Sequence, residues 1–322
     1  MMLVASPATL RRHGVLGINA RNARYVMAYN PRHRYPLVDD KLRTKQLALD
    51  MGMAVPELYG VVSHQHEVHR LPSIIAGRDD FVIKPAQGSG GNGVLVIAGR
   101  RRNLFFKADG EAIDRDDLAF HVSKTLSGLF SLGGERDRAM IEYRVCFDPL
   151  FEKVSYQGVP DVRIIVFLGY PVMAMVRLPT RASDGKANLH QGAIGAGIDV
   201  GRGRTLQGVW GNEVIREHPD TGAPIAGLEI PHWPAMLAIA ARCYPLSGLG
   251  YLGVDLVLDR RRGPLLLELN ARPGLNIQLA NRQGLRPRLE LVEAAADPAA
   301  EADARVAFAR RHFRHPFRPP AS

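Results

Sequence analysis

The chain has 322 residues, a mass of 35.4 kDa and a hydrophobic content of 46%, enough for a substantial core in one large or two ordinary domains. Its only two cysteines, Cys146 and Cys243, are too few for a disulfide framework. No run of about eighteen apolar residues occurs and the N-terminus lacks the order of a signal peptide, so the sequence predicts a soluble, cytoplasmic protein without a transmembrane segment.

The net charge of +10 is concentrated at the two ends of the chain. Residues 1–45 hold nine Lys or Arg and two Asp, residues 301–322 hold five Arg and two Asp or Glu, and the sequence between them is neutral. A neutral body does not suit a nucleic-acid-binding surface, so no specific nucleic-acid partner is expected. Only seven residues are lysine against 35 arginines, which makes each lysine within a motif informative.

In chain order, the first half predicts a basic lead-in and then a small lobe. Residues 1–38 show little periodicity and are interpreted as an extended or lightly structured lead-in. A helix is predicted from Asp39 or Asp40, either of which can cap it, to Gly52, with Pro56 beyond its end. Strands at 58–62, 81–84, 94–98 and 104–109 and a helix at 115–130 complete a small lobe over 39–140.

The second half predicts a larger, strand-rich lobe over 141–300 and a basic, disordered tail over 301–322. Strands are expected at 139–145, 161–169, 171–179, 251–259 and 264–270, and helices at 232–244 and 285–296. The strands are mostly joined by short turns and therefore antiparallel, which predicts an α+β fold of two lobes that meet near residues 140–150.

A glycine-rich loop lies between two strands of the small lobe. It reads "GSGGNG" and consists of Gly88, Ser89, Gly90, Gly91, Asn92 and Gly93. A dinucleotide-binding loop needs a helix after it, but here a strand follows, so the loop is interpreted as a flap whose backbone amides close over a triphosphate. Lys84 ends the incoming strand and can reach those phosphates. The alternative is a flexible hairpin turn with an incidental lysine.

The strands 251–259 and 264–270 place two acids and an amide on one face. If residues 260–263 form the loop, Asp259 faces Pro264 and Asp255 faces Glu268, with Asn270 on the same face. Two opposed carboxylates destabilise a strand pair unless a cation lies between them. Carboxylate and amide oxygens suit Mg²⁺, so the pair predicts a metal site facing a nucleotide. The alternative is the exposed polar face of an edge hairpin.

The order of these motifs resembles the ATP-grasp carboxylate-amine ligases. The match covers about residues 14–292 and rests on the segments "DDKLRTK", "FVIKPAQGSGGNGV", "IEYRV", "DVRIIVFLG", "KANLHQGA", "GVDLVLD" and "LLLELNARPGL". It is most similar to the alpha-L-glutamate ligase-like members, in the branch that includes ribosomal-protein glutamate ligases. The resemblance implies an ATP-grasp fold, in which two α+β lobes clasp ATP between antiparallel sheets, here with a truncated N-terminal lead-in.

The resemblance also implies roles for individual residues. Lys41 and Lys84 would contact the α- and β-phosphates of ATP, and the loop Gly88 to Gly93 would close over the β- and γ-phosphates. The hinge against which adenine lies would be Glu142, Tyr143, Arg144 and Val145. One or two Mg²⁺ or Mn²⁺ ions would be held by Asp255, Glu268 and Asn270. The place where a carboxylate attacks the γ-phosphate would be lined by Arg163, Asn188 and Arg272.

The implied activity is ATP-dependent amide formation. The donor would be an amino acid such as glutamate or another carboxylate, and the acceptor an amine of a peptide, a protein or a small molecule. Two alternatives remain open, namely an ATP-grasp small-molecule kinase and a non-catalytic nucleotide-binding regulatory protein. Many relatives carry a full α/β domain where this chain has only forty residues before Lys41, so acceptor recognition is not predicted. Relatives often form dimers or tetramers, which allows a homo-oligomer.

Overall fold

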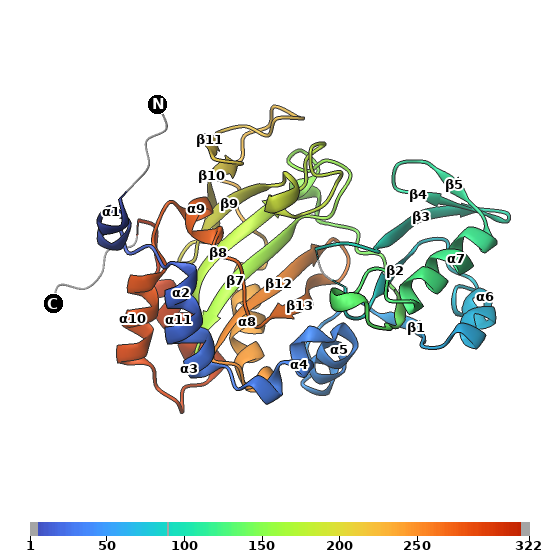
Figure 1. Cartoon of the computed structure of the whole chain (residues 1–322). Helices are drawn as coiled ribbons and strands as arrows, with labels where there is room; N and C mark the ends of the chain where they lie inside the picture. The colour runs from blue at the N-terminus through green and yellow to red at the C-terminus, as the bar shows by residue number, and fades with distance from the viewer. Residues whose placement is uncertain (1–5, 89, 317–322) are drawn as a thin grey trace.

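The computed structural model describes residues 6–88 and 90–316 and has two lobes, each built on an antiparallel sheet (Figure 1). The sheet of the small lobe has the strand order β1-β6-β2-β3-β4-β5, and that of the large lobe β11-β10-β9-β8-β7-β12-β13. The connection from one sheet to the other runs from the end of β6 to the start of β7. The α+β fold of two antiparallel lobes is therefore as expected.

The small lobe packs one amphipathic helix against its sheet. Its strands are β1 (Leu58–Val62), β2 (Phe81–Pro85), β3 (Leu95–Arg101), β4 (Leu104–Lys107), β5 (Ala112–Ile113) and β6 (Ala139–Glu142). Its helices are η3 (Gln65–Arg70), α6 (Leu71–Ile74), α7 (Arg115–Leu126) and η4 (Leu132–Gly134). Asp114 caps α7, and the helix then buries Leu118 and Val122 in the core that Phe81 and Ile83 supply from β2.

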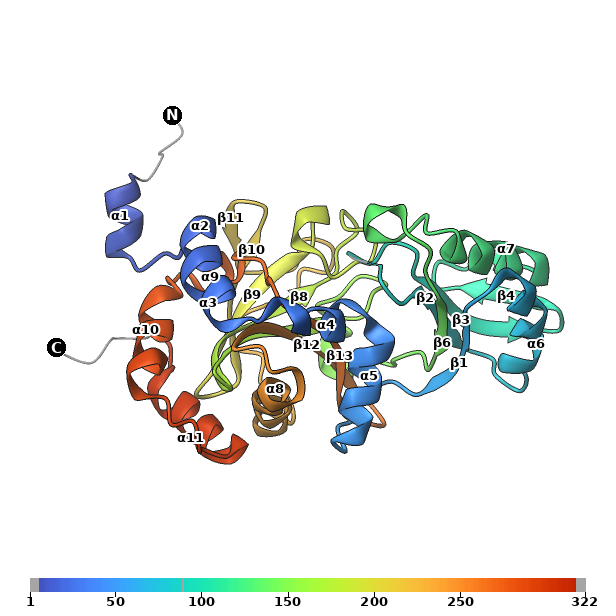
Figure 2. The same ribbon diagram turned by 60° about the horizontal axis from the view of Figure 1, so that its bottom comes forward.

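The large lobe has helices on both faces of its sheet. Its strands are β7 (Asp161–Phe167), β8 (Tyr170–Leu178), β9 (Ile194–Asp199), β10 (Arg204–Trp210), β11 (Glu213–Ile215), β12 (Tyr251–Asp259) and β13 (Gly263–Asn270). Its helices are η5 (Pro149–Phe151), η6 (Leu189–Gln191), α8 (Trp233–Ser247), α9 (Ile277–Asn281), α10 (Arg286–Ala295) and α11 (Ala302–His312). Figure 2 shows α8 on one side of this sheet and α9 on the other.

The lead-in packs on the large lobe and is more ordered than expected from its weak periodicity. It forms α1 (Pro7–Arg12), α2 (Ile18–Ala20), η1 (Arg21–Val26), α3 (Met27–Tyr29), η2 (Arg32–Arg34) and α4 (Pro36–Asp39). Tyr25 is buried with its ring 5.4 Å from that of Phe167 and 6.0 Å from that of Tyr251. The Asn30 amide donates to the carbonyls of Tyr251, at 2.7 Å, and Ala271, at 3.0 Å. Aromatic burial therefore fixes this segment on the sheet.

Helix α5 (Lys41–Asp50) forms where expected but contacts both lobes. Asp40 caps it by accepting from the backbone of Leu42 at 3.0 Å. Its first residue, Lys41, donates its backbone N–H to Ala86 after β2, at 3.0 Å, while the helix as a whole packs against β13. The assignment of residues 39–56 to the small lobe alone is therefore too simple.

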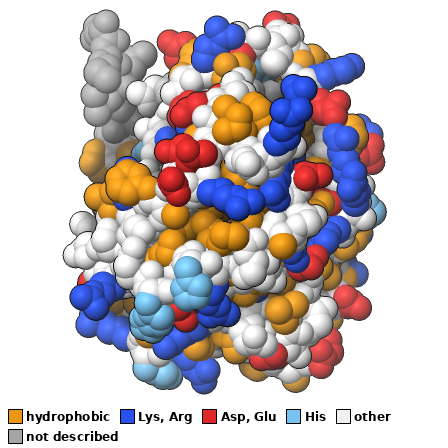
Figure 3. Space-filling view, turned by 90° about the vertical axis from the view of Figure 1, so that its right-hand side faces the viewer, with side chains coloured by type: hydrophobic (Ala, Val, Ile, Leu, Met, Phe, Trp, Pro, Cys, Tyr) orange, Lys and Arg blue, Asp and Glu red, His pale blue; other side chains and the backbone are white. Residues whose placement is uncertain are grey.

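The C-terminal tail was expected to be disordered, and this prediction is wrong over Ala302–His312, which form α11. Val306, Ala309 and Phe313 are buried, and α11 packs on α8 and β8. The helical spacing of Val306, Ala309 and Phe313 was overlooked in the sequence because arginines surround these residues. Within residues 6–88 and 90–316, no helix has the length and apolar character needed to cross a bilayer. On the small-lobe side, Figure 3 shows acidic and basic side chains interspersed, in agreement with a neutral body.

The β12–β13 hairpin pairs Asp255 with Glu268 as predicted, but by a different register. Asp259 faces Gly263, and Leu258 faces Pro264, one residue out of step with the expected loop. A β-bulge at Leu267 then adds one residue to β13 and restores the pairing of Asp255 with Glu268. The predicted loop was one residue too long, and the bulge was not predicted. These two errors cancel at the pair Asp255 and Glu268.

Candidate functional site

A row of charged side chains crosses four neighbouring strands of the large sheet. Arg177 on β8 lies opposite Asp161 on β7, Arg163 on β7 lies opposite Asp255 on β12, and Asp255 lies opposite Glu268 on β13. Residues 161 and 163 share a face because strand side chains alternate. Opposite charges directly across a strand pair are favourable, so the sequence encodes this row through the register of the strands.

Asp255 is the centre of this row and is fully buried. Arg163 donates Nε to Asp255 Oδ1 at 2.7 Å and Nη2 to Oδ2 at 2.5 Å, and Arg177 Nη2 donates to Oδ2 at 2.8 Å. Burial alone would raise the pKa of Asp255, but the two guanidinium groups outweigh it and hold this pKa below its usual range. Asp255 is therefore an anion at any working pH.

Asp161 and Arg177 extend the row beyond the residues selected from the sequence. Arg177 Nη2 donates to Asp161 Oδ2 at 2.6 Å, and its Nε donates to the other carboxylate oxygen. Burial raises the pKa of Asp161 to about 6, while Arg177 opposes this shift. Arg177 thus bridges two buried carboxylates and fixes their relative positions.

The three predicted metal ligands lie together. The Asn270 amide is 3.3 Å from Asp255 Oδ2 and 3.4 Å from Glu268 Oε1. Within the described ranges, no group of three or more His, Cys, Asp or Glu side chains could hold a metal ion. In this structure the Asn270 side-chain nitrogen, and not its oxygen, faces the two carboxylates. With the amide turned over, Asp255, Glu268 and Asn270 would offer oxygen ligands of the kind that Mg²⁺ binds beside water and phosphate oxygens.

Lys41 joins this acidic row to the glycine-rich loop. Its Nζ donates to the carbonyl of Gly88 and lies 3.7 Å from Glu268 Oε2. Both side chains are partly accessible, at 17% for Lys41 and 30% for Glu268, so each can still meet a ligand. A cation next to an open carboxylate and the loop is suited to phosphate oxygens.

Lys84 lies in a second charged cluster at the end of the small sheet. Glu142, at the end of β6, accepts Lys84 Nζ on one carboxylate oxygen and has Lys45 Nζ 3.2 Å from the other. All three side chains are buried. Burial lowers the pKa of Lys45, and the charge of Glu142 partly offsets this effect. Lys45 was missed from the sequence, although the scarcity of lysine singles it out as it does Lys41.

The predicted hinge, Glu142 to Val145, is tied to the tip of the β12–β13 hairpin. The hydroxyl of Tyr143 donates to Asp259 Oδ2 at 3.0 Å, and the backbone of Cys146 donates to the same oxygen at 2.9 Å. Burial would raise the pKa of Asp259, but its several hydrogen bonds lower it overall. Arg144 pairs with Asp80 at 3.3 Å, and Val145 is half-buried. Asp259, like Asp161, Arg177 and Lys45, is a residue that sequence reasoning missed.

The glycine-rich loop lies against residues of the large lobe. A Cβ atom on Gly90 would lie 3.4 Å from the amide nitrogen of Asn188, and one on Gly91 would lie 3.9 Å from Lys186 Cγ. Positive φ angles at Gly90, Gly91 and Gly93 require glycine there. Asn92 is exposed, and Ser89 lies outside the described residues. The loop therefore has the position of a flap over the site.

The base of the loop is fixed on both sides. Asp137 accepts from the backbone of Gln87 at 3.0 Å, and His121 Nε2 donates to the carbonyl of Gly93 at 3.0 Å. A Cβ atom on Gly93 would lie 2.4 Å from Phe130 Cγ. These contacts hold the ends of the flap on the small lobe.

Two predicted residues lie at the edges of this arrangement. Asn188 caps η6 by accepting from the backbone of His190 at 3.0 Å. Arg272 is exposed, with its guanidinium 4.9 Å from the centre of the Tyr35 ring. Burial raises the pKa of Asp39, and Arg272 and Lys41 both oppose this shift, so the two cations lie within electrostatic range of one carboxyl group.

The two-lobed fold, the flap and the acidic strand pair define the class of protein as ATP-grasp. The chain matches the family model for "Sugar-transfer associated ATP-grasp" over residues 20–294 and belongs to that family. The ATP-grasp fold inferred from the sequence is thereby confirmed.

The curated relatives are probable alpha-L-glutamate ligases. The chain is 24% identical over 238 residues to one from Ectopseudomonas mendocina (strain ymp), covering 73% of this chain and 56% of the relative. It is 23% identical over 270 residues to one from Pseudomonas putida (strain F1), covering 83% and 64%. The similarity to this group is confirmed, and the chain spans less than two thirds of the length of these relatives.

Solved structures to which the chain is similar include two ligases. D-alanine–D-alanine ligase from Bacillus anthracis is 12% identical with a TM-score of 0.46, covering 86% of this chain and 70% of that one. The ATP-grasp ligase PsnB in complex with a minimal precursor is 16% identical with a TM-score of 0.43, covering 83% and 62%.

Proposed function

We propose that this protein is an ATP-dependent ligase that joins a carboxylate to an amine. In the first step a carboxylate oxygen attacks the γ-phosphorus of ATP, the bond from that phosphorus to the bridging oxygen breaks, and ADP leaves. In the second step the amine nitrogen attacks the acyl carbon, the bond from this carbon to the phosphate oxygen breaks, and inorganic phosphate leaves as the nitrogen loses a proton to solvent. Membership of the ATP-grasp family and the similarity to probable alpha-L-glutamate ligases support this proposal.

The observation that carries the proposal is the position of Lys41. Its Nζ contacts the Gly88 carbonyl and lies 3.7 Å from Glu268, so one cation joins the flap to the acidic strand pair. A triphosphate bound between the flap and the β12–β13 strand pair would meet glycine amides on one side and the proposed metal ligands on the other. This combination suits phosphoryl transfer because it can stabilise the charge that develops on the transferred group.

We assign nucleotide binding to residues on both lobes. Lys41 and Lys84 remain the proposed phosphate contacts, and Lys45 joins them because it shares Glu142 with Lys84. Adenine is proposed to lie against the hinge, Glu142 to Val145. A bound Mg²⁺ would be held by Asp255, Glu268 and Asn270 and would supply Lewis-acid stabilisation of the phosphates. Mn²⁺ remains an alternative.

The residues proposed around the carboxylate have distinct roles. Arg163 is occupied by its two hydrogen bonds to Asp255, so it serves first to orient that carboxylate. Asn188 faces the flap and is the proposed contact to the reacting group. Arg272 is exposed and is proposed to reach the same region from beside Lys41.

The experiment measures ADP release from Mg-ATP by the purified chain with a panel of carboxylic acids, including glutamate. Hydroxylamine is present to trap an acyl phosphate as a hydroxamate. Hydroxamate with one class of acid, lost in Glu268→Gln, is the expected result. Because the family description refers to sugar transfer, the amine panel for the second step includes amino sugars beside peptides.

The alternatives give different results in the same assay. ADP release with phosphorylation of a hydroxyl compound, and without any requirement for a carboxylate, would favour the small-molecule kinase. Binding of ATP without ADP release for every acid and amine would favour a regulatory protein. Either outcome overturns the ligase.

A further inference from the structure

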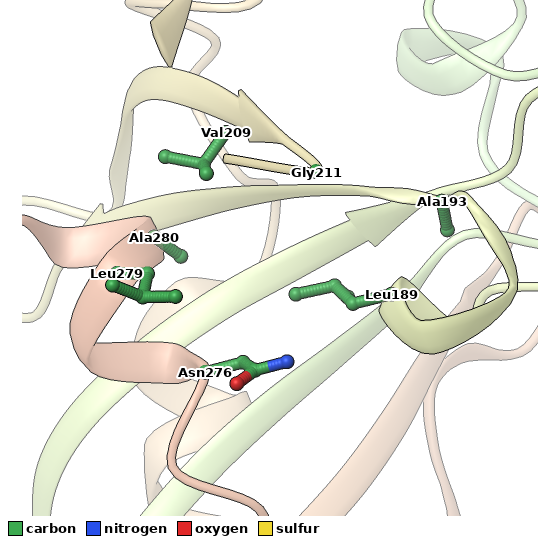
Figure 4. Close-up of a pocket in the computed structure, with 7 residues that line it drawn as sticks. All are labelled: Leu189, Ala193, Val209, Gly211, Asn276, Leu279 and Ala280. Carbon is green, nitrogen blue, oxygen red and sulfur yellow. The ribbon is translucent and has the colours of Figure 1, made fainter. Parts of the chain in front are cut away.

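A small hollow opens in the large lobe beside the candidate site. It encloses about 290 Å³ of empty space, including its open mouth. Seven residues from three segments line it, as Figure 4 shows, namely Leu189, Ala193, Val209, Gly211, Asn276, Leu279 and Ala280. These segments are the loop that contains η6, the end of β10, and the start of α9.

Two walls of the hollow continue segments of the site. Leu189 directly follows Asn188, whose amide nitrogen lies against Gly90 of the flap. Asn276 follows the end of β13 by six residues, on the segment that leaves Asn270. Both walls are therefore joined through the chain to residues that are proposed for the site.

The lining is chemically selective. Three of the seven residues have aliphatic side chains at least as large as valine, two are buried alanines, and Asn276 is the one polar side chain. Ala193 and Ala280 are each 1% exposed, so their small size leaves the space open. None of the seven is Lys, Arg or His. An aliphatic group gains by entering this space, whereas a second carboxylate would lose hydration without meeting a cation among these residues.

The walls are held in place by hydrogen bonds to buried groups. Trp210 Nε1 and Thr180 Oγ1 both donate to the carbonyl of Gly192, each at 2.8 Å, which fixes the loop after Leu189. The Asn281 amide donates to the carbonyl of Ala174 at 2.9 Å and fixes α9 on the sheet. The hollow is thus formed before a ligand binds, as small-molecule sites usually are.

We propose that this hollow binds the side chain of the carboxylic acid that is activated, and that this side chain is a short aliphatic group, such as that of valine or leucine. The inference rests on the proposed ligase function and sharpens it. It departs from glutamate, the donor that the resemblance implies, because the seven lining residues include no cation to pair with a second carboxylate.

The test compares leucine, valine and glutamate in the hydroxylamine trap. Leucine or valine is expected to form hydroxamate with a kcat/KM at least about tenfold above that of glutamate. Leu189→Ala removes part of one wall and is expected to lower kcat/KM for the preferred acid several-fold while leaving the KM for ATP unchanged. Leu129→Ala is the matched control because Leu129 is 64% exposed on the small lobe, and it should change neither value.

A binding measurement keeps the two proposals separable. Saturation-transfer NMR follows the methyl groups of leucine with protein, Mg²⁺ and a non-hydrolysable ATP analogue, in wild type and in Leu189→Ala. If glutamate alone forms hydroxamate and Leu189→Ala behaves as the control, the ligase stands and the aliphatic pocket is refuted. If no acid forms hydroxamate, the ligase fails, and methyl saturation that is lost in Leu189→Ala still establishes the pocket. Absence of both signals refutes both.

Discussion

Lys84 forms an ion pair with Glu142 on the neighbouring strand β6, and neither side chain is more than 8% exposed. Glu142 also faces Lys45, so two buried cations share one anion. The cluster therefore carries an excess positive charge at the end of the small sheet, next to the hinge. We expect this excess charge to be satisfied by nucleotide phosphates.

The first prediction concerns Glu142→Gln. Removing the shared anion leaves two buried lysines unpaired, and breaking a buried ion pair costs about 3 kcal/mol of unfolding free energy. Urea denaturation measures this loss. Glu57→Gln is the control, because Glu57 pairs with Arg262 at 2.8 Å but is 52% exposed, and the loss there should stay below about 1 kcal/mol. Equal losses in both variants would show that the Lys45 and Lys84 ammonium groups do not depend on Glu142.

The second prediction separates the two opposed carboxylates. Asp255→Asn should lower the unfolding free energy by about 3 kcal/mol because Arg163 and Arg177 lose a buried partner. Glu268→Gln should cost less than about 1 kcal/mol, since Glu268 is 30% exposed and its ion-pair partner lies at 3.7 Å.

The same pair separates stability from activity. Glu268→Gln should lower hydroxamate formation roughly 100-fold through lost charge stabilisation of the transferred phosphate. Denaturation curves and trapping rates on the same preparations check both values. A Glu268→Gln protein that is fully active would remove this residue from the proposed metal site.

The positions of most strands along the chain were predictable because local patterns determine them. Alternating apolar residues and short turns indicate these strands, and the cap at Asp40 marks the start of α5. The pairing of Asp255 with Glu268 was predicted from loop length, but the β-bulge at Leu267 could not be, since a bulge leaves no signal in a leucine-rich run. Here it compensated for the error in the loop.

The rest of the site depends on distant contacts. Arg177 reaches Asp255 only because β7 lies between β8 and β12, an order that sequence alone does not show. Lys45 is one helical turn after Lys41, yet it points to Glu142 while Lys41 points to Gly88 and Glu268. The two lysines point in different directions because α5 contacts both lobes.

The third prediction is a pH dependence of stability through His121. Burial lowers the pKa of His121 below its usual value of 6.5, so the folded protein favours the neutral ring while the unfolded chain takes up a proton at a higher pH. The contribution of His121 to the free energy of unfolding is fully present above pH 6.5. It is lost as the pH falls through the lower pKa of the folded state. Thermal unfolding of wild type and His121→Gln between pH 7.5 and 5.5 checks this. His121→Gln, whose amide can still donate to the Gly93 carbonyl, should lose less stability than wild type between pH 7.5 and 5.5. Identical pH profiles of the two proteins would show that His121 is not the source of the pH dependence.

The fourth prediction tests the flap through Gly93→Ala. Gly93 has a φ of +74°, and a Cβ there would lie 2.4 Å from Phe130 Cγ, so the substitution strains the backbone and displaces the base of the loop. Gly110→Ala is the matched control, because Gly110 has a φ of +90° but no atom within 4 Å of its Cβ position. Both variants should lose about 1 kcal/mol of unfolding free energy from the positive φ, and Gly93→Ala should lose more. Calorimetric titration should show an increase of about tenfold in the Kd of Mg-ATP for Gly93→Ala alone, as expected when roughly 1.4 kcal/mol of flap contacts is lost. Unchanged ATP affinity in Gly93→Ala would mean that the loop does not close over the phosphates.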